Sequence, residues 1–169
     1  MERCCDEAAV RDEASFQDWF EASYPRLSGS GVWLRGGELN TLPLAAREAR
    51  PFRVLFARLS SYLDCAASFT HPLLYQIAAG VEGVYPDLAY LPPLADLPAF
   101  AAGRVPWLLG TQSKRGPLGF DLVGLSLSIV QELLNLPRIL AESGIPLARS
   151  ERLRRPELPL LILGGASAL

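Results

Sequence analysis

FDLVGLS, the sequence from Phe120 to Ser126, is an apolar run of the kind that forms a strand buried on both faces of a sheet. A helical spacing of apolar residues follows over Ile129–Glu142, where Pro137 is expected to kink the helix and Gly144 to end it. A second apolar run at Leu158–Leu163 then leads into two glycines. Strand, helix and strand in this order predict a βαβ unit with parallel strands.

The same alternation extends toward the N-terminus. Apolar runs predict strands at Phe52–Ala57 and Val84–Leu91, and the segment from Thr70 to Gly80 or Gly83 predicts a helix between them. A short helix at Leu94–Ala102 and a minor strand at Pro106–Leu109 are expected next. Strands recurring about every 30 residues suit right-handed βαβ units. The sequence therefore predicts an α/β fold with a doubly wound, mainly parallel sheet.

The first 50 residues have a different character, and we treat them as a helical or irregular extension to an α/β domain over residues 51–169. Phe16, Trp19, Phe20 and Tyr24 recur at helical spacing in a strongly acidic stretch, which predicts an amphipathic helix over Glu13–Ala22. The aromatic face of this helix packs either on its own domain, which we favour, or on a partner.

Composition excludes several classes of protein. Half of the 169 residues are hydrophobic and 20% are charged, which is typical of a folded chain with a real core and not of a disordered one. The net charge of −2 gives no reason to expect nucleic acid or an anionic membrane as a partner. Three cysteines, two of them adjacent, make a poor disulfide framework, and no apolar run approaches the ~20 residues of a membrane span. We expect a cytoplasmic protein.

Motifs with defined chemistry are few. The sequence holds no phosphate-binding Gly-Lys loop, no His-Glu-x-x-His, no Gly-x-Gly-x-x-Gly and no Cys-x-x-Cys, and its single histidine argues against a metal site. The segment Gly124–Ser128 lacks the final glycine of a hydrolase nucleophile elbow, and His71 lies upstream of Ser126 although that class places its histidine downstream. Three roles are open to Ser126. Either it simply ends a strand, which we favour, or its hydroxyl contacts a ligand; the role of a nucleophile is the least favoured. We expect Glu132 and Glu142 to be solvated.

The carboxyl ends of the strands are the expected ligand edge, because ligands of open parallel sheets bind there. Gly164, Gly165 and Ala166 follow the last predicted strand, and paired glycines let a ligand approach the backbone closely. Together with Ser126 they outline a slot with few side chains, suited to the extended tail of a large ligand. His71 lies at the start of a helix near the same edge. We expect its side chain to form hydrogen bonds to the backbone; a role as a metal ligand is the less favoured alternative.

The chain from Val32 to its C-terminus resembles the N-terminal, cobalamin (B12)-binding-like domain of B12-binding radical SAM proteins. The resemblance depends on four pieces whose order and spacing say more than any one of them. These pieces are Gly36–Asn40, Thr70–Tyr75, Gly119–Leu127, and Gly144–Leu147 together with Leu161–Gly165.

The resemblance implies a flavodoxin-like fold that holds the nucleotide tail of cobalamin at the carboxyl ends of its strands. The residues it assigns to this cofactor are Ser126, Leu127, Ser128, Gly164, Gly165, Ala166 and His71. The Asp-x-His-x-x-Gly motif that supplies a cobalt ligand is lacking, so we expect no protein histidine on the cobalt. A degenerate scaffold that keeps the fold but not the ligand is the alternative.

The same resemblance places catalysis outside this chain. A radical SAM domain, in cis or in trans, would bring S-adenosylmethionine and a 4Fe–4S cluster, because this chain has no three-cysteine cluster motif. Domains of this kind have a fifth strand beyond the two glycines, so the resemblance implies a sheet without its last strand. An open sheet edge makes a homodimer plausible.

Overall fold

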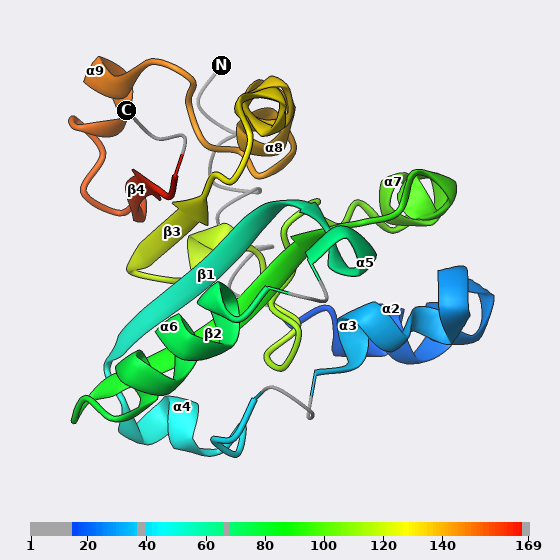
Figure 1. Cartoon of the computed structure of the whole chain (residues 1–169), viewed down its shortest axis with the longest axis horizontal. Helices are drawn as coiled ribbons and strands as arrows, with labels where there is room; N and C mark the ends of the chain where they lie inside the picture. Colours follow the sequence, from blue (N-terminus) through cyan, green and yellow to red (C-terminus); the bar gives the residue numbers. More distant parts are fainter. Residues whose placement is uncertain (1–14, 37–39, 66–67, 167–169) are drawn as a thin grey trace.

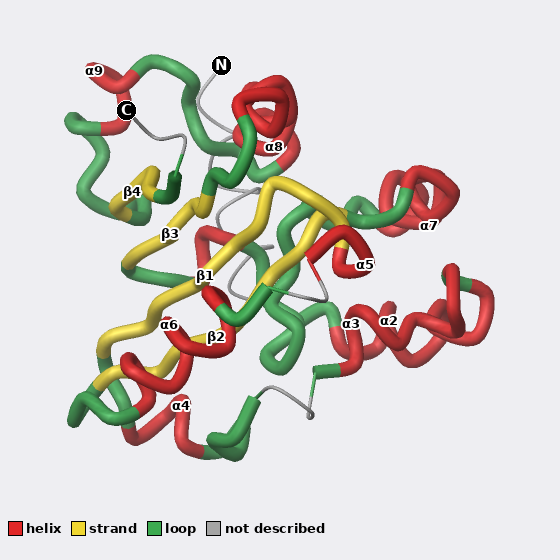
Figure 2. The backbone as a smooth tube through the Cα atoms, viewed as in Figure 1, coloured by secondary structure: helices red, strands yellow, loops and turns green. Residues whose placement is uncertain are grey.

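Four parallel strands form one sheet in the order β2-β1-β3-β4 (Figures 1 and 2). The computed structural model describes residues 15–36, 40–65 and 68–166. The strands are β1 (Phe52–Ser61), β2 (Val84–Leu91), β3 (Leu122–Ser126) and β4 (Leu160–Gly164). The predicted α/β fold with a doubly wound parallel sheet is confirmed.

Helices and short 3₁₀ turns connect the strands and build the extension. The extension contains α2 (Gln17–Ser23), η1 (Tyr24–Arg26), η2 (Ser28–Gly31), α3 (Val32–Arg35) and α4 (Ala46–Ala49). The connections contain α5 (Tyr62–Cys65), α6 (Thr70–Ala79), η3 (Leu94–Asp96), α7 (Leu97–Gly103), η4 (Pro117–Gly119), η5 (Val130–Asn135), α8 (Leu136–Glu142) and α9 (Arg149–Arg152).

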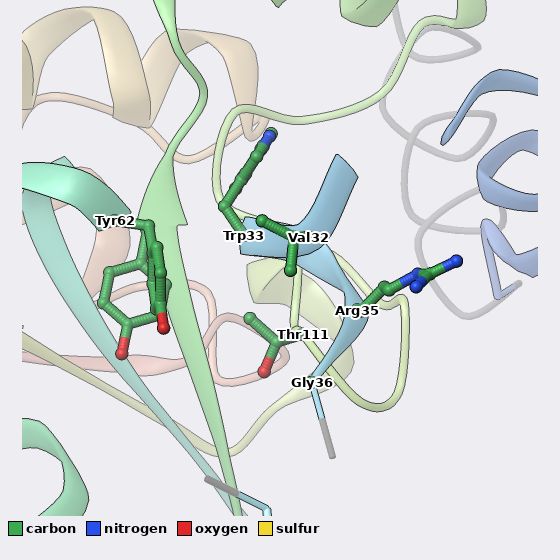
Figure 3. Close-up of a pocket in the computed structure, with 7 residues that line it drawn as sticks. Val32, Trp33, Arg35, Gly36, Tyr62 and Thr111 are labelled. Carbon is green, nitrogen blue, oxygen red and sulfur yellow. The ribbon is translucent and has the colours of Figure 1, made fainter. Parts of the chain in front are cut away.

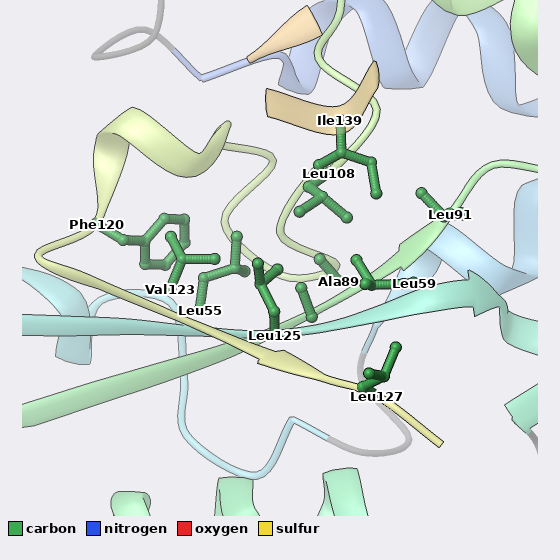
Figure 4. Close-up of a cluster of buried hydrophobic side chains, with 11 residues drawn as sticks. Leu55, Leu59, Ala89, Leu91, Leu108, Phe120, Val123, Leu125, Leu127 and Ile139 are labelled. Atoms are coloured by element: carbon green, nitrogen blue, oxygen red, sulfur yellow. The ribbon is translucent and has the colours of Figure 1, made fainter. Parts of the chain in front are cut away.

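The two faces of the sheet are covered differently. On one face, an eleven-residue apolar cluster reaches from Leu55 and Ala57 of β1 to Ile139 of α8 (Figure 4). On the other face, α6 places Tyr75 against Leu88 of β2. Because α6 covers only β1 and β2, the same face of β3 and β4 lies open among the described residues.

The extension is packed into the domain. Trp19 of α2 meets the ring of Phe100 in α7 edge-on, with 4.8 Å between ring centroids. The buried carboxylate of Asp96 accepts a hydrogen bond from the Ser28 N–H at 2.9 Å and one from the Trp33 indole at 3.2 Å. The favoured prediction for the aromatic helix, packing on its own domain, is confirmed. The helix begins at Gln17, and the predicted start at Glu13 lies outside the described residues.

Two expected elements differ in the structure. Pro106–Leu109 forms no strand but a buried loop, in which Leu108 and Leu109 are almost fully covered. The single kinked helix expected over Ile129–Glu142 is a 3₁₀ segment followed by α8, because Pro137 occupies the first turn of α8. Proline is favourable at that position, where its absent N–H has no helical partner to lose.

Candidate functional site

The carboxyl ends of β1 and β3 form the point where the strand order reverses. From β1 the chain crosses to β2 on one side, whereas β3 and β4 continue on the other. In open parallel sheets the crevice at such a point is the usual place for a ligand. Here a cluster of polar side chains occupies it, and the candidate site is built around this cluster.

Glu132 is the centre of that cluster, and sequence reasoning missed it. One carboxylate oxygen accepts hydrogen bonds from the N–H groups of Ser128 at 2.5 Å and Ile129 at 3.2 Å. The other oxygen accepts the Ser60 hydroxyl and lies 3.4 Å from the guanidinium of Arg58. We call these five residues the Glu132 network. They join the carboxyl end of β1 to the loop after β3.

Burial and hydrogen bonding oppose each other at Glu132. Burial raises the pKa of its carboxyl group, but the Ser60, Ser128 and Ile129 donors and the positive charge of Arg58 hold that pKa below its ordinary value. Glu132 is 4% exposed, so the prediction that it is solvated is wrong. A glutamate at the third position of a helical segment, able to bond the N–H groups at its start, was the sequence signal that could have found it.

Arg58 and His71 are buried side by side with Glu132. Neither ring nitrogen of His71 has a hydrogen-bond partner of ordinary geometry among the described residues, and the ring is 2% exposed. Burial and the nearby charge of Arg58 lower the pKa of His71 to about 4, which the Ala57 carbonyl and Glu132 only partly offset. His71 is therefore neutral at physiological pH, and its ring makes no hydrogen bond to Ser126 of the kind that a hydrolase needs.

Ser126 and Gly164 lie next to each other, as the sequence led us to expect of two strand ends. They are paired in the register of β3 and β4, and the Leu127 N–H donates to the Gly164 carbonyl at 2.7 Å. Ser126 also pairs with Arg58 of β1. Since alternate residues of a strand share a face, Ser126 and Gly164 lie on the α6 side, two residues beyond Gly124, which packs on Phe56.

The open face of β3 and β4 is a shallow apolar shelf. We define the β3–β4 shelf by the six residues that register and alternation place on it: Leu122, Gly124, Ser126, Leu160, Ile162 and Gly164. Leu160 and Ile162 are 58% and 48% exposed, although they are large aliphatic residues of a strand. The Ser126 hydroxyl makes no side-chain hydrogen bond within the described residues, and a Cβ at Gly164 would meet no atom within 4 Å.

The two glycines after β4 have different roles. Gly165 adopts φ +120°, and a Cβ there would fall 2.2 Å from the Leu127 carbonyl oxygen. The backbone of Leu127 therefore occupies the space that a side chain at Gly165 would need. Leu127 is fully buried in the core, Ser128 is held by Glu132 through its N–H, and Ala166 is exposed at the end of the described chain. Within this predicted set, Ser126 and Gly164 are the pair that opens onto the shelf.

A second hollow lies at the carboxyl ends of β1 and β2. Tyr62 of α5 lies across it from Val32 and Trp33 of α3, with Thr111 at its base (Figure 3). Its volume is about 110 Å³. That is well below the ~300–1,000 Å³ of typical small-molecule sites, so this hollow does not suit a cofactor.

The described residues bring no three His, Cys, Asp or Glu side chains together as a metal site. None of the described helices is long and apolar enough to cross a membrane. Cys4, Cys5 and residues 37–39, which belong to the Gly36–Asn40 piece, lie outside the described residues.

Comparison with known proteins gives one similarity. The family model described as "Radical SAM proteins, N-terminal" matches residues 70–169, from the start of α6 through β4. No curated protein and no solved structure matches the chain.

Proposed function

The chain belongs to the family of N-terminal domains of radical SAM proteins, and we propose that it holds the nucleotide tail of a cobalamin on the β3–β4 shelf. In general terms, the family identifies the chain as an accessory module associated with a radical SAM domain. The main support for cobalamin binding is that Ser126 and Gly164 lie next to each other at the open carboxyl end of the shelf.

The residues of the shelf suit the chemistry of such a tail. Gly164 leaves the floor low at the open end, and Leu160 and Ile162 offer exposed aliphatic surface to a flat apolar base. Ser126 adds a hydroxyl with no side-chain partner within the described residues, available to a sugar or phosphate oxygen. When bound, a corrinoid would supply methyl-transfer or redox chemistry. This chain's own part is to bind and orient the tail, and His71 is buried too deeply to reach a ligand on the shelf.

The test mixes the purified chain with hydroxocobalamin, removes free cofactor by desalting and records the visible spectrum. Gly164→Leu should abolish co-elution of the corrinoid, because it fills the open position without a clash in the fold. Ala102→Leu adds the same kind of bulk to the exposed face of α7 and should leave binding unchanged. Circular dichroism checks that both variants fold.

Two results would contradict cobalamin binding. One is the absence of corrinoid on the wild-type chain after desalting. The other is wild-type binding by Gly164→Leu, because the tail would then lie elsewhere.

A degenerate scaffold is the second candidate, and the outer face of α6 favours it. Three apolar residues at intervals of four follow this face, starting at the N-cap residue, and each is more than half exposed: Phe69, Leu73 and Ile77. Residues four apart share one face of a helix, and exposed apolar stripes mark interaction surfaces. Since the family pairs this domain with a radical SAM domain, we propose that domain as the occupant of the α6 stripe.

The stripe is tested by binding to a radical SAM domain supplied as a separate chain. Leu73→Glu combined with Ile77→Glu should weaken association at least tenfold while leaving the fold intact, because both side chains are 59% exposed. Leu134→Glu, at an 81% exposed position of η5, is the matched control. Equal affinity for the wild type and the double variant would rule out the stripe as the docking face.

A further inference from the structure

Three arginines from distant parts of the chain meet at the amino-terminal edge of the sheet, opposite the edge discussed above. Arg47 comes from α4, Arg53 from the start of β1 and Arg115 from the loop before η4. Figure 1 shows α4 beside the beginning of β1, away from the end where α5 follows. The arginines line a hollow of about 380 Å³, within the ~300–1,000 Å³ of small-molecule sites. Its other lining residues are Leu118, Gly119, Phe120, Asp121 and Glu157.

Arg47 is buried without a matching anion in the described structure. It is 9% exposed, and one guanidinium nitrogen donates to the Gly119 carbonyl at 2.8 Å. The Nε atoms of Arg47 and Arg53 are buried and have no hydrogen-bond acceptor among the described residues. Burial and the charges of Arg115 and Arg53 lower the pKa of Arg47 to about 10, and Tyr85 and the carboxylate of Asp87 only partly offset this. Buried charges are normally paired, because leaving one unpaired is costly.

The carboxylates in the lining do not neutralise the three arginines. Glu157 is paired with Arg155 at 2.7 Å. Asp121 directs one oxygen to the backbone N–H of Arg53 at 2.7 Å, and no ion pair joins it to the three guanidinium groups within the described residues. Three guanidinium groups against the one remaining carboxylate leave the hollow with an excess of two positive charges. A dianion with several oxygens is the complement of this excess.

We propose that the Arg47–Arg53–Arg115 hollow binds a phosphoryl dianion, either inorganic phosphate or the phosphate group of a small monoester. Guanidinium groups suit such a ligand because each presents paired N–H donors that match two phosphate oxygens. The hollow lies at the opposite end of the sheet from Ser126 and Gly164. Ser126 pairs with Arg58, five residues beyond Arg53 in β1, and strands rise about 3.3 Å per residue, so the two sites are about 16 Å apart along the strand. The proposal is therefore independent of cobalamin binding.

Calorimetric titration of the full chain tests the site, at pH 8 in chloride buffer of constant ionic strength. The probes are inorganic phosphate, glycerol 2-phosphate and acetate. Arg115→Gln should weaken phosphate binding at least tenfold, as expected when a charged hydrogen-bonding partner is lost. Arg154→Gln removes an exposed arginine outside the hollow and should leave affinity unchanged. Asp121→Asn should tighten binding severalfold, because it removes the opposing charge and keeps an oxygen to accept the Arg53 N–H.

The opposite signs expected for Arg115→Gln and Asp121→Asn separate binding from folding, since a misfolded variant cannot gain affinity. Tighter binding of glycerol 2-phosphate than of phosphate would identify a monoester as the ligand, and the reverse order would identify phosphate itself. The proposal is overturned if phosphate produces no binding heat, if acetate binds as tightly as phosphate, or if Arg154→Gln weakens binding as much as Arg115→Gln. Weaker binding by a folded Asp121→Asn variant would also overturn it.

Discussion

Replacing Gly165 with alanine should destabilise the protein severely, whereas the same change at Gly164 should be almost neutral. Gly165 has a φ of +120°, and its missing Cβ would lie 2.2 Å from the carbonyl oxygen of Leu127 and 2.9 Å from the carbonyl carbon and the amide nitrogen of that residue. All three atoms belong to the backbone, so no side-chain rotation relieves the clash. Gly164 has no atom within 4 Å of the corresponding position.

The size of the effect follows from two contributions. Holding a residue with a side chain in this region of φ costs about 1–3 kcal/mol. Forcing extra volume into a packed contact costs a further 1–3 kcal/mol or so. We therefore expect Gly165→Ala to lower the free energy of unfolding by about 4 kcal/mol. That is a large part of the roughly 5–15 kcal/mol of a typical domain.

Urea denaturation followed by circular dichroism measures both variants against the wild type. Gly164→Ala should stay within about 0.5 kcal/mol of wild type, as is usual for surface changes without a clash. A loss below about 1 kcal/mol for Gly165→Ala would refute the assignment of this glycine to backbone packing. Equal losses at the two positions would refute the distinction between them.

Three further predictions concern buried polar groups. Glu132→Gln should cost about 3–5 kcal/mol, because it leaves Arg58 buried without its counter-charge, and adding Arg58→Met should recover part of the loss in a double-mutant cycle measured in urea. The pKa of His71 is about 4 in the folded protein and 6.5 ordinarily, so the unfolded chain takes up the proton first and stability falls as the pH drops through this window. The total loss is about 3 kcal/mol, and a His71→Gln variant that kept the full slope between pH 6.5 and 5 would contradict this account. Asp96→Ala should loosen the extension and expose Trp33, which a red shift of tryptophan fluorescence and faster proteolysis would report; unchanged spectra and proteolysis would contradict that role.

The strands could be predicted because strands buried on both faces consist of continuous apolar residues. Val84–Leu91 is a strand over the predicted residues, and seven of its eight residues are buried. The first strand was predicted too short, since it continues from Ala57 through Arg58 to Ser61. In the sequence, a charged residue such as Arg58 indicates the end of a buried strand unless an oppositely charged partner is known to lie beside it. Here the partner is Glu132, which lies 74 residues away.

The candidate site was predictable only in part, for a related reason. Parallel strands bring their carboxyl ends to one edge, so the adjacency of Ser126 and Gly164 followed from the predicted topology. The sequence did not show which of Gly164 and Gly165 faces open space. That depends on how the segment after β4 packs on the backbone of Leu127 after β3, and no residue spacing in either segment predicts this contact. The arginine hollow joins residues 47, 53 and 115, and no local pattern connects them.

The Glu132 network also explains why the open surface lies on the shelf and not in the crevice where the strand order reverses. N–H groups at the start of a helical segment normally make that crevice an anion site. Here the N–H groups of Ser128 and Ile129 are already bonded to a carboxylate of the same chain. Arg58, the nearest cation, points its charge at the same carboxylate. The crevice thus satisfies itself internally, and a tail bound as we propose would make its contacts on the open side of β3 and β4, at Ser126 and Gly164.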